Sequence, residues 1–110
     1  MYYFIVQLSK YLKIGYIMII TFADKETEKL WHWKKNPKFG EIALRALRKL
    51  ELLDAVPNLQ ELKKIPGLDL HALKGSRHGQ HSIKVNDQFR VCFIWGADNH
   101  AYEVEIVDYH

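Results

Sequence analysis

The spacing of apolar residues changes from a helical period to an extended one about halfway along the chain. Before residue 56 the apolar positions recur at intervals of three and four, which is typical of helices with one buried face. After residue 66 they alternate with polar residues, which is typical of strands with one buried face. This pattern predicts one strand, two helices and then about four strands, an α+β fold with both helices packed on one face of the sheet.

The first half of the chain contains the predicted helices. Residues 18–22 form a short apolar and β-branched run that favours a strand, and either Thr21 or Asp24 can cap a helix over residues 24–35. A second helix is predicted over residues 38–55. Its apolar side chains form a single stripe that consists of Ile42, Ala43, Ala46, Leu47, Leu50 and Leu53.

The second half of the chain contains the predicted sheet. One helical turn is expected at residues 59–62, between two proline-containing segments. Strands are predicted over residues 68–73, 81–85, 89–95 and 101–107. Short segments rich in glycine, asparagine and aspartate separate these strands and supply the turns between them.

The alternation within residues 89–95 predicts which side chains are buried. The apolar face, which must lie under the helices, consists of Phe89, Val91, Phe93 and Trp95. The other face carries Arg90, Cys92 and Ile94. An arginine in the middle of a strand projects from a rigid platform, and this position is well suited to binding an anion.

Length and composition are those of one globular domain. The chain has 110 residues, of which 48% are hydrophobic and 26% are charged. We expect the compact domain to span residues 18–110 and residues 1–17 to form an N-terminal extension, which is too short and too polar to span a bilayer. The single cysteine, Cys92, excludes an internal disulfide, favours a reducing cytoplasm and is expected to be buried and unreactive.

Residues that can move protons or bind anions gather toward the end of the chain. Three of them follow the last predicted strand and would lie at the rim of the sheet: Asp108, Tyr109 and His110. Upstream, His71 and Lys74 are three residues apart, so they share one face only if the backbone bends near Gly75. Further donors that could bind a polyanion are Arg77, His81 and Lys84.

Several kinds of chemistry are disfavoured by what the sequence lacks. His78 and His81 are too few ligands for a zinc site, and neither a glycine-rich phosphate loop nor a nucleophilic serine elbow is present. We therefore expect no metal and no cofactor. RNA cleavage needs neither, because the 2′-hydroxyl is the nucleophile and the protein supplies a base, an acid and cations. Composition alone does not distinguish such an enzyme from a binding domain.

Three segments resemble the HigB toxins of the RelE/ParE superfamily. They are LHALKG at residues 70–75, SIKVNDQFRVCF at residues 82–93 and VEIVDYH at residues 104–110, and residues 20–25 and 43–50 are also similar. The resemblance covers about residues 18–110. It implies a β-α-α unit followed by an antiparallel sheet, in a toxin of a type II toxin-antitoxin pair that cleaves messenger RNA on the ribosome. The implied partner is a HigA-like helix-turn-helix antitoxin, and operator DNA would be reached only through it.

The resemblance also implies roles for individual residues. His71 matches a site histidine of the family, Lys74 the cation of Leu-Lys-Gly, and Arg90 the phosphate-binding arginine. The terminal site residues are matched by Asp108, Tyr109 and His110. Our hypothesis is that Arg90 and Lys74 stabilise the phosphorane and that His71 and His110 exchange protons. Tyr109 and Asp108 would orient these groups or substitute for them.

Two positions depart from the family pattern. His81 stands where an aromatic residue commonly precedes Ser-Ile, and Lys84 stands where arginine is frequent. Lysine keeps the charge there but loses the fork of donors that a guanidinium offers. Two other functions remain open at this point: a non-catalytic toxin of the same fold that binds DNA gyrase, as ParE-type proteins do, or an interaction module without toxicity.

Overall fold

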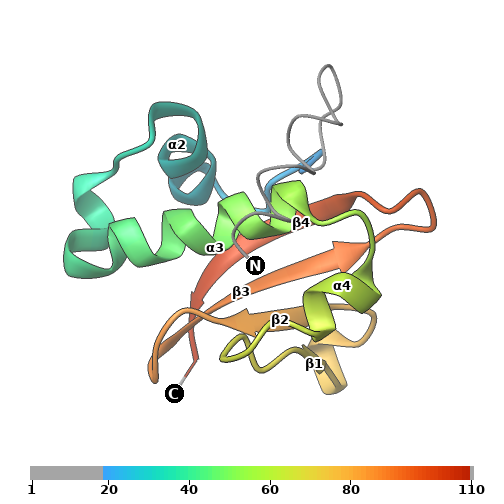
Figure 1. Cartoon of the computed structure of the whole chain (residues 1–110). Coiled ribbons are helices and arrows are strands. Elements are labelled where there is room, and N and C mark those ends of the chain that lie inside the picture. The colour runs from blue at the N-terminus through green and yellow to red at the C-terminus, as the bar shows by residue number, and fades with distance from the viewer. Residues whose placement is uncertain (1–18, 110) are drawn as a thin grey trace.

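The computed structural model of the chain describes residues 19–109 and shows helices layered on one four-stranded sheet (Figure 1). Its elements are α2 (Lys25–Trp33), η1 (Pro37–Ile42), α3 (Ala43–Ala55), α4 (Leu59–Lys63), β1 (His71–Ala72), η2 (Gly75–Arg77), β2 (His81–Lys84), β3 (Phe89–Trp95) and β4 (Ala101–Asp108). The strands are antiparallel and follow the order β1-β2-β3-β4. Helix α3 crosses the sheet over β3 and β4, so the predicted α+β fold is confirmed.

Helix α2 begins where the capping chemistry predicted. Asp24 is its N-cap, and the side chain accepts a hydrogen bond from the Thr27 backbone N–H at 3.2 Å. The fully buried Thr27 then ties this helix to the sheet, because its hydroxyl accepts a hydrogen bond from the Ile106 backbone N–H at 3.0 Å.

The second predicted helix is divided in the structure. A 3-10 segment, η1, precedes α3, and the break lies at Gly40, which has φ of 54° and ψ of −130°. Glycine adopts such angles readily because it has no Cβ, and no helix can continue through them. The single helix predicted over residues 38–55 was therefore wrong in its first turns. The buried stripe of α3 was correct at Ala46, Leu47, Leu50 and Leu53.

The predicted first strand is present only as isolated pairing. Ile19 and Phe22 form separate parallel bridges to Ala101 and Val104 of β4. The strand β4 bulges between these bridges, where Glu103 has φ of 52° and donates its backbone N–H to the Thr21 hydroxyl at 2.8 Å. Residue 18 and the N-terminal extension predicted for residues 1–17 lie outside the described residues.

The strand predicted over residues 68–73 is reduced to the two residues of β1. Gly67 and Asp69 have φ of 82° and 50°, and these left-handed residues interrupt the extended backbone before β1 begins. The other strands agree with the prediction to within one residue at each end. In β3, Val91 and Phe93 are fully buried in the core below the helices, as the alternation predicted, and Phe89 and Trp95 pack against that core.

Candidate active site on the open face of the sheet

The face of the sheet away from the helices carries two rows of cross-strand neighbours, and we call it the open face. One row consists of His71, Ser82, Cys92 and Glu105, and the other consists of Lys84, Arg90 and Val107. Side chains of a strand alternate between faces, so these residues lie opposite the buried Val91 and Phe93. The open face therefore gathers residues from all four strands.

Arg90 is held at the centre of this face by two neighbours. Its Nε donates to the Ser82 hydroxyl at 2.7 Å, and Nη2 donates to the Ser82 carbonyl at 3.4 Å. Its Nη1 lies 3.3 Å from a carboxylate oxygen of Asp69, and Nη2 also donates to the Asp69 carbonyl. Only 13% of the Arg90 side chain is exposed, so the guanidinium is a fixed and partly desolvated positive charge.

Asp69 connects Arg90 with the predicted site histidine. One carboxylate oxygen is 2.9 Å from His71 Nε2, while the other contacts Arg90. The hydrogen bond from Arg90 is the main reason that the pKa of Asp69 is lowered, and the charge of His71 lowers it further. The carboxylate is therefore ionised at neutral pH and joins the imidazole and the guanidinium in one cluster.

The remaining predicted cations lie on β2 and in the segment around η2. Lys84 is the β2 neighbour of Arg90, and its ammonium lies 3.0 Å from Asp87. Arg77 reaches from η2 to Glu105 of β4 at 3.3 Å, so it lies over the other row of the open face. Lys74 is exposed immediately before η2, and the chain bends after it at Gly75, which has φ of 66°.

The terminal residues lie at the end of β4 next to the β2–β3 turn. Asp108 is the neighbour of Phe89 and accepts a hydrogen bond from the Gln88 side-chain amide at 3.0 Å. The Tyr109 backbone N–H donates to the Gln88 carbonyl at 2.7 Å, and 43% of the tyrosine is exposed. Continued alternation from Val107 places Tyr109 on the open face. His110 lies outside the described residues.

His81 lies on the opposite face of the sheet from Arg90. It is the neighbour of Phe93 and stacks on that ring, with centroids 6.1 Å apart. Burial lowers the pKa of His81, and its Nδ1 is buried with no hydrogen-bond partner among the described residues. A pocket of about 250 Å³ beside it is lined by Leu59, Gln60, Lys63, Leu70, Ala72 and His81. The structure thus separates His81 from the other predicted RNA-binding residues.

Cys92 has the environment that the sequence predicted. It is fully buried under the open face, and burial raises the pKa of the thiol. Within residues 19–109, no three histidine, cysteine or acidic side chains are arranged to hold a metal ion. The same residues contain no helix that is long and apolar enough to cross a membrane.

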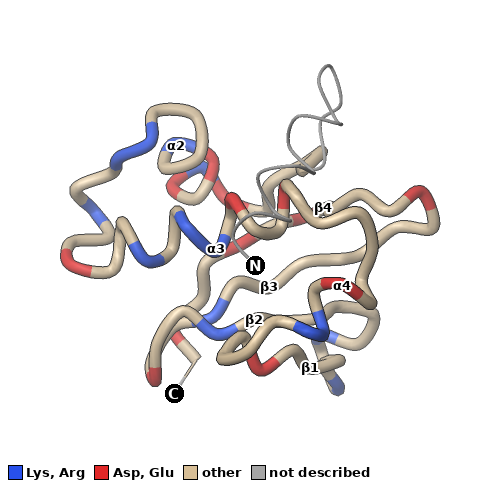
Figure 2. Tube along the Cα trace, in the orientation of Figure 1, with Lys and Arg blue, Asp and Glu red and all other residues tan. Residues whose placement is uncertain are grey.

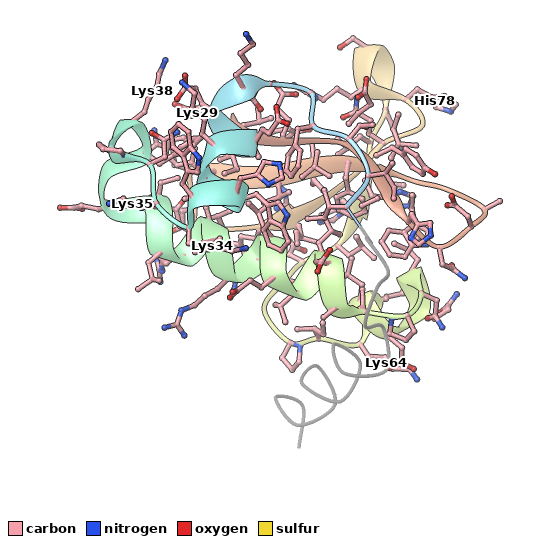
Figure 3. All side chains as sticks on the ribbon, turned by 90° about the horizontal axis from the view of Figure 1, so that it is seen from above. Lys29, Lys34, Lys35, Lys38, Lys64 and His78 are labelled. Atoms are coloured by element: carbon pink, nitrogen blue, oxygen red, sulfur yellow. The ribbon has the colours of Figure 1, made fainter. Side chains whose placement is uncertain are left out.

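A second group of cations lies on the helices. Figure 2 shows basic positions around α2, η1 and α3 as well as on neighbouring strands of the sheet. Lys29, Lys34, Lys35 and Lys38 project around α2 and η1, whereas His78 lies on another side of the molecule (Figure 3). Aromatic rings accompany these cations, since the Lys34 ammonium is 3.6 Å from the Trp31 ring centroid. This group is separate from the cluster around Arg90.

Sequence reasoning missed three residues of the site. Asp69 and Ser82 hold Arg90, and Gln88 holds the end of β4. The sequence did contain a signal for Ser82, because the alternation that placed Arg90 on the open face also applies to the neighbouring strand. A signal for Asp69 existed too, because residues two apart in a strand, such as Asp69 and His71, share a face. Its contact with Arg90 gave no such signal, because that contact depends on a left-handed turn at Asp69.

Comparison with known proteins agrees with the fold and the motifs. Residues 20–110 match the family described as HigB-like toxin, the RelE-like toxin HigB of type II toxin-antitoxin systems. The chain is also 35% identical over 80 residues to Toxin HigB-1 of Vibrio cholerae serotype O1, an alignment that covers 71% of this chain and 84% of that protein. The chain therefore belongs to the HigB-like family of RelE-like toxins of type II toxin-antitoxin systems.

Proposed function

We propose that this toxin is a metal-independent endoribonuclease that cuts messenger RNA on the ribosome and so arrests translation in the cytoplasm. The observation that carries the proposal is the cluster in which Asp69 joins the His71 imidazole to the Arg90 guanidinium on the open face. When a 2′-hydroxyl attacks the adjacent phosphate, the reaction requires a base for the hydroxyl proton and a positive charge near the phosphate. Family membership supports the same activity.

In the proposed reaction the RNA supplies its own nucleophile. A histidine takes the proton of the 2′-hydroxyl, the 2′-oxygen bonds to phosphorus, and the bond from phosphorus to the 5′-oxygen breaks. A second group gives a proton to the leaving 5′-oxygen. The products are a 2′,3′-cyclic phosphate and a 5′-hydroxyl. Arg90 and Lys74 balance the extra charge on the phosphorane.

His71 and His110 are the acid and base in this proposal, and Tyr109 and Asp108 orient them or substitute for them. The neighbouring cations Arg77 and Lys84 contact phosphates on either side of the cut. Each of these two cations has a carboxylate within 3.3 Å, so RNA must displace or share these partners. The Lys84–Asp87 pair is exposed, and such a pair contributes only about 0–1 kcal/mol, which a phosphate contact can replace.

Arg90→Ala tests the proposed activity in cells. Expression of the wild-type chain should stop growth and create cut ends in cellular messenger RNA, and sequencing of those ends should map the cuts. Arg90→Ala should remove the cuts and the growth arrest. Arg45→Ala is the matched control, because Arg45 is an exposed arginine of α3 and not of the sheet. If Arg90→Ala cuts as well as the wild type, our assignment of Arg90 is wrong.

The same experiment separates cleavage from inhibition by binding. A non-catalytic toxin that acts on DNA gyrase would stop growth with intact messenger RNA and with altered DNA supercoiling. A chain without toxic activity would leave growth unchanged. Either outcome would contradict the proposed ribonuclease.

We also propose that a HigA-like helix-turn-helix antitoxin neutralises this toxin and that operator DNA is bound only through that antitoxin. Family membership implies an antitoxin partner. A small helix-turn-helix protein encoded next to this chain should co-purify with it and restore growth when both are expressed. An adjacent protein of this kind that neither binds nor protects would contradict the pairing.

A further inference from the structure

We propose that Asp69 is a positioning residue of the site, whose carboxylate fixes the tautomer of His71 and holds the imidazole against Arg90. His71 Nδ1 is then the nitrogen that takes or gives the proton. The inference rests on the proposed ribonuclease function and adds a residue to which neither the motifs nor family membership assigned a role.

The geometry around Asp69 supports this role through three contacts. Its two carboxylate oxygens divide between His71 Nε2 at 2.9 Å and Arg90 Nη1 at 3.3 Å. Its backbone carbonyl accepts a further hydrogen bond from Arg90 Nη2. Arg90 is fixed independently by Ser82, which lies on a central part of the sheet and is fully buried. The position of the imidazole is therefore fixed relative to the central sheet, through Asp69 and Arg90.

The charge of Asp69 decides which nitrogen of His71 carries the proton. An ionised carboxylate can only accept hydrogen bonds, so the Nε2 atom beside it must be the donor. The pKa of Asp69 is lowered chiefly by its hydrogen bond from Arg90, which keeps the carboxylate ionised. In neutral His71 the free lone pair is then on Nδ1, on the other side of the ring. This resembles the way in which a buried aspartate orients the histidine of a hydrolase triad.

The backbone at Asp69 adopts an uncommon conformation. Its φ of 50° lies in the left-handed region, which costs free energy for residues other than glycine, although aspartate tolerates it better than most. The turn that begins at Gly67 lets the carboxylate contact both His71 of β1 and Arg90 of β3. A regular extension of β1 would instead place Asp69 opposite Lys84, one strand away from Arg90.

The first test measures the tautomer without RNA. The ¹⁵N chemical shifts of the His71 ring in the full chain should show a protonated Nε2 and a bare Nδ1 at a pH where histidine is neutral. In Asp69→Ala both shifts should move toward the average of two exchanging tautomers. Asp69→Asn should restore part of the wild-type pattern, because an amide oxygen also accepts a hydrogen bond.

The second test measures cleavage of messenger RNA bound to ribosomes. Asp69→Ala should lower kcat at least about 10-fold and change KM by less than about threefold, because orientation acts on the chemical step. The kcat of Asp69→Asn should lie between the kcat of Asp69→Ala and that of the wild type. The matched control is Asp98→Asn, which removes another hydrogen-bonded carboxylate, in the turn between β3 and β4, and should leave kcat unchanged.

The outcomes separate this inference from the function on which it rests. If the wild-type chain does not cut RNA, the proposed function is wrong, whatever the NMR spectra show. If the wild type cuts and Asp69→Ala has the same kcat, Asp69 has no positioning role, even if the shifts change. If Asp69→Ala and Asp69→Asn bind RNA more tightly and cut faster, Asp69 competes with the phosphate for Arg90, and the inference is overturned.

Discussion

The cations of the open face each lie beside a carboxylate. Arg77 pairs with Glu105, Lys84 with Asp87 and Arg90 with Asp69, at distances from 3.0 to 3.3 Å. The Lys84 and Asp87 pair is exposed to water, so little free energy opposes its exchange for a phosphate. Arg90 differs because only 13% of its side chain is exposed. Its charge is therefore the one whose position the fold specifies most strongly.

His81 should make the stability of the protein depend on mildly acidic pH. Burial lowers the pKa of this imidazole in the folded state, so the unfolded chain takes up the proton first. The resulting loss of stability is absent above about pH 6.5, the pKa of histidine in the unfolded chain. It grows as the pH falls toward the lower pKa of His81 in the folded protein. His81→Phe keeps the ring on Phe93 and removes this titration. The free energy of unfolding should therefore fall less between pH 7.5 and 5.5 in the variant than in the wild type.

The matched control for this prediction is the exposed histidine of the loop that follows η2. His78→Phe removes an exposed imidazole and should leave the pH dependence as it is in the wild type. Chemical denaturation at several pH values measures all three proteins. If the free energy of unfolding changes with pH equally in His81→Phe and in the wild type, His81 titrates alike in the folded and unfolded chains, and the prediction is wrong.

These residues show how far the sequence could specify the site. Alternation along one strand was sufficient to place Arg90 opposite Val91 and Phe93, because the side-chain period of a strand is fixed. The same rule puts His81 on the face of Ile83 and Val85, opposite Arg90, as the structure shows. Alternation in the strand predicted over residues 68–73 puts Asp69 on the same face as His71, but the contact of Asp69 with Arg90 could not be predicted, since it depends on one left-handed residue and on pairing between distant segments.

The elements are joined by a few specific contacts as well as by apolar packing. Thr27 of α2 accepts the Ile106 N–H of β4 inside the core, and Asp54 of α3 accepts the Ile19 N–H at 3.3 Å. The first contact attaches α2 to β4. The second attaches α3 to Ile19, which is itself bridged to Ala101 of β4.

Thr27→Val should destabilise the protein by about 1–3 kcal/mol, because it leaves the buried Ile106 N–H without an acceptor while keeping the shape of the side chain. Thr27→Ser is the control, since it keeps the hydroxyl, and the difference between the two variants reports the hydrogen bond. Urea denaturation measures both. A Thr27→Val protein as stable as the wild type would mean that this contact contributes nothing to the attachment of α2.

The boundaries of elements were predictable where the pattern was long and regular. Residues 89–95 alternate over seven positions and form β3 as predicted. The break at Gly40 and the short β1 escaped prediction because single left-handed residues override a favourable apolar pattern around them. A glycine inside a predicted helix was a visible signal for the first of these, whereas Asp69 offered none as clear.

At the scale of the whole molecule, the helices and the site occupy different faces of one sheet. Helices α2 and α3 cover the core face (Figure 1). Cross-strand pairing and side-chain alternation place His71 and Arg90 on the other face. The fold can therefore be stabilised on one side while polar residues on the other side meet a partner. The family to which the chain belongs implies an antitoxin as one partner of the protein. RNA is the partner that we propose for the active state.

The most direct test of this account replaces one 2′-hydroxyl of the substrate. The full chain should cut a messenger RNA bound to the ribosome to give a 2′,3′-cyclic phosphate and a 5′-hydroxyl. The same cut should appear when the divalent ions are exchanged for ions that keep the ribosome intact but do not catalyse RNA cleavage. A 2′-deoxy nucleotide immediately before the mapped bond should abolish that cut and leave cuts elsewhere unchanged. Continued cutting at the substituted bond, or a 5′-phosphate at the new end, would contradict attack by the 2′-hydroxyl and with it the roles proposed for His71 and Arg90.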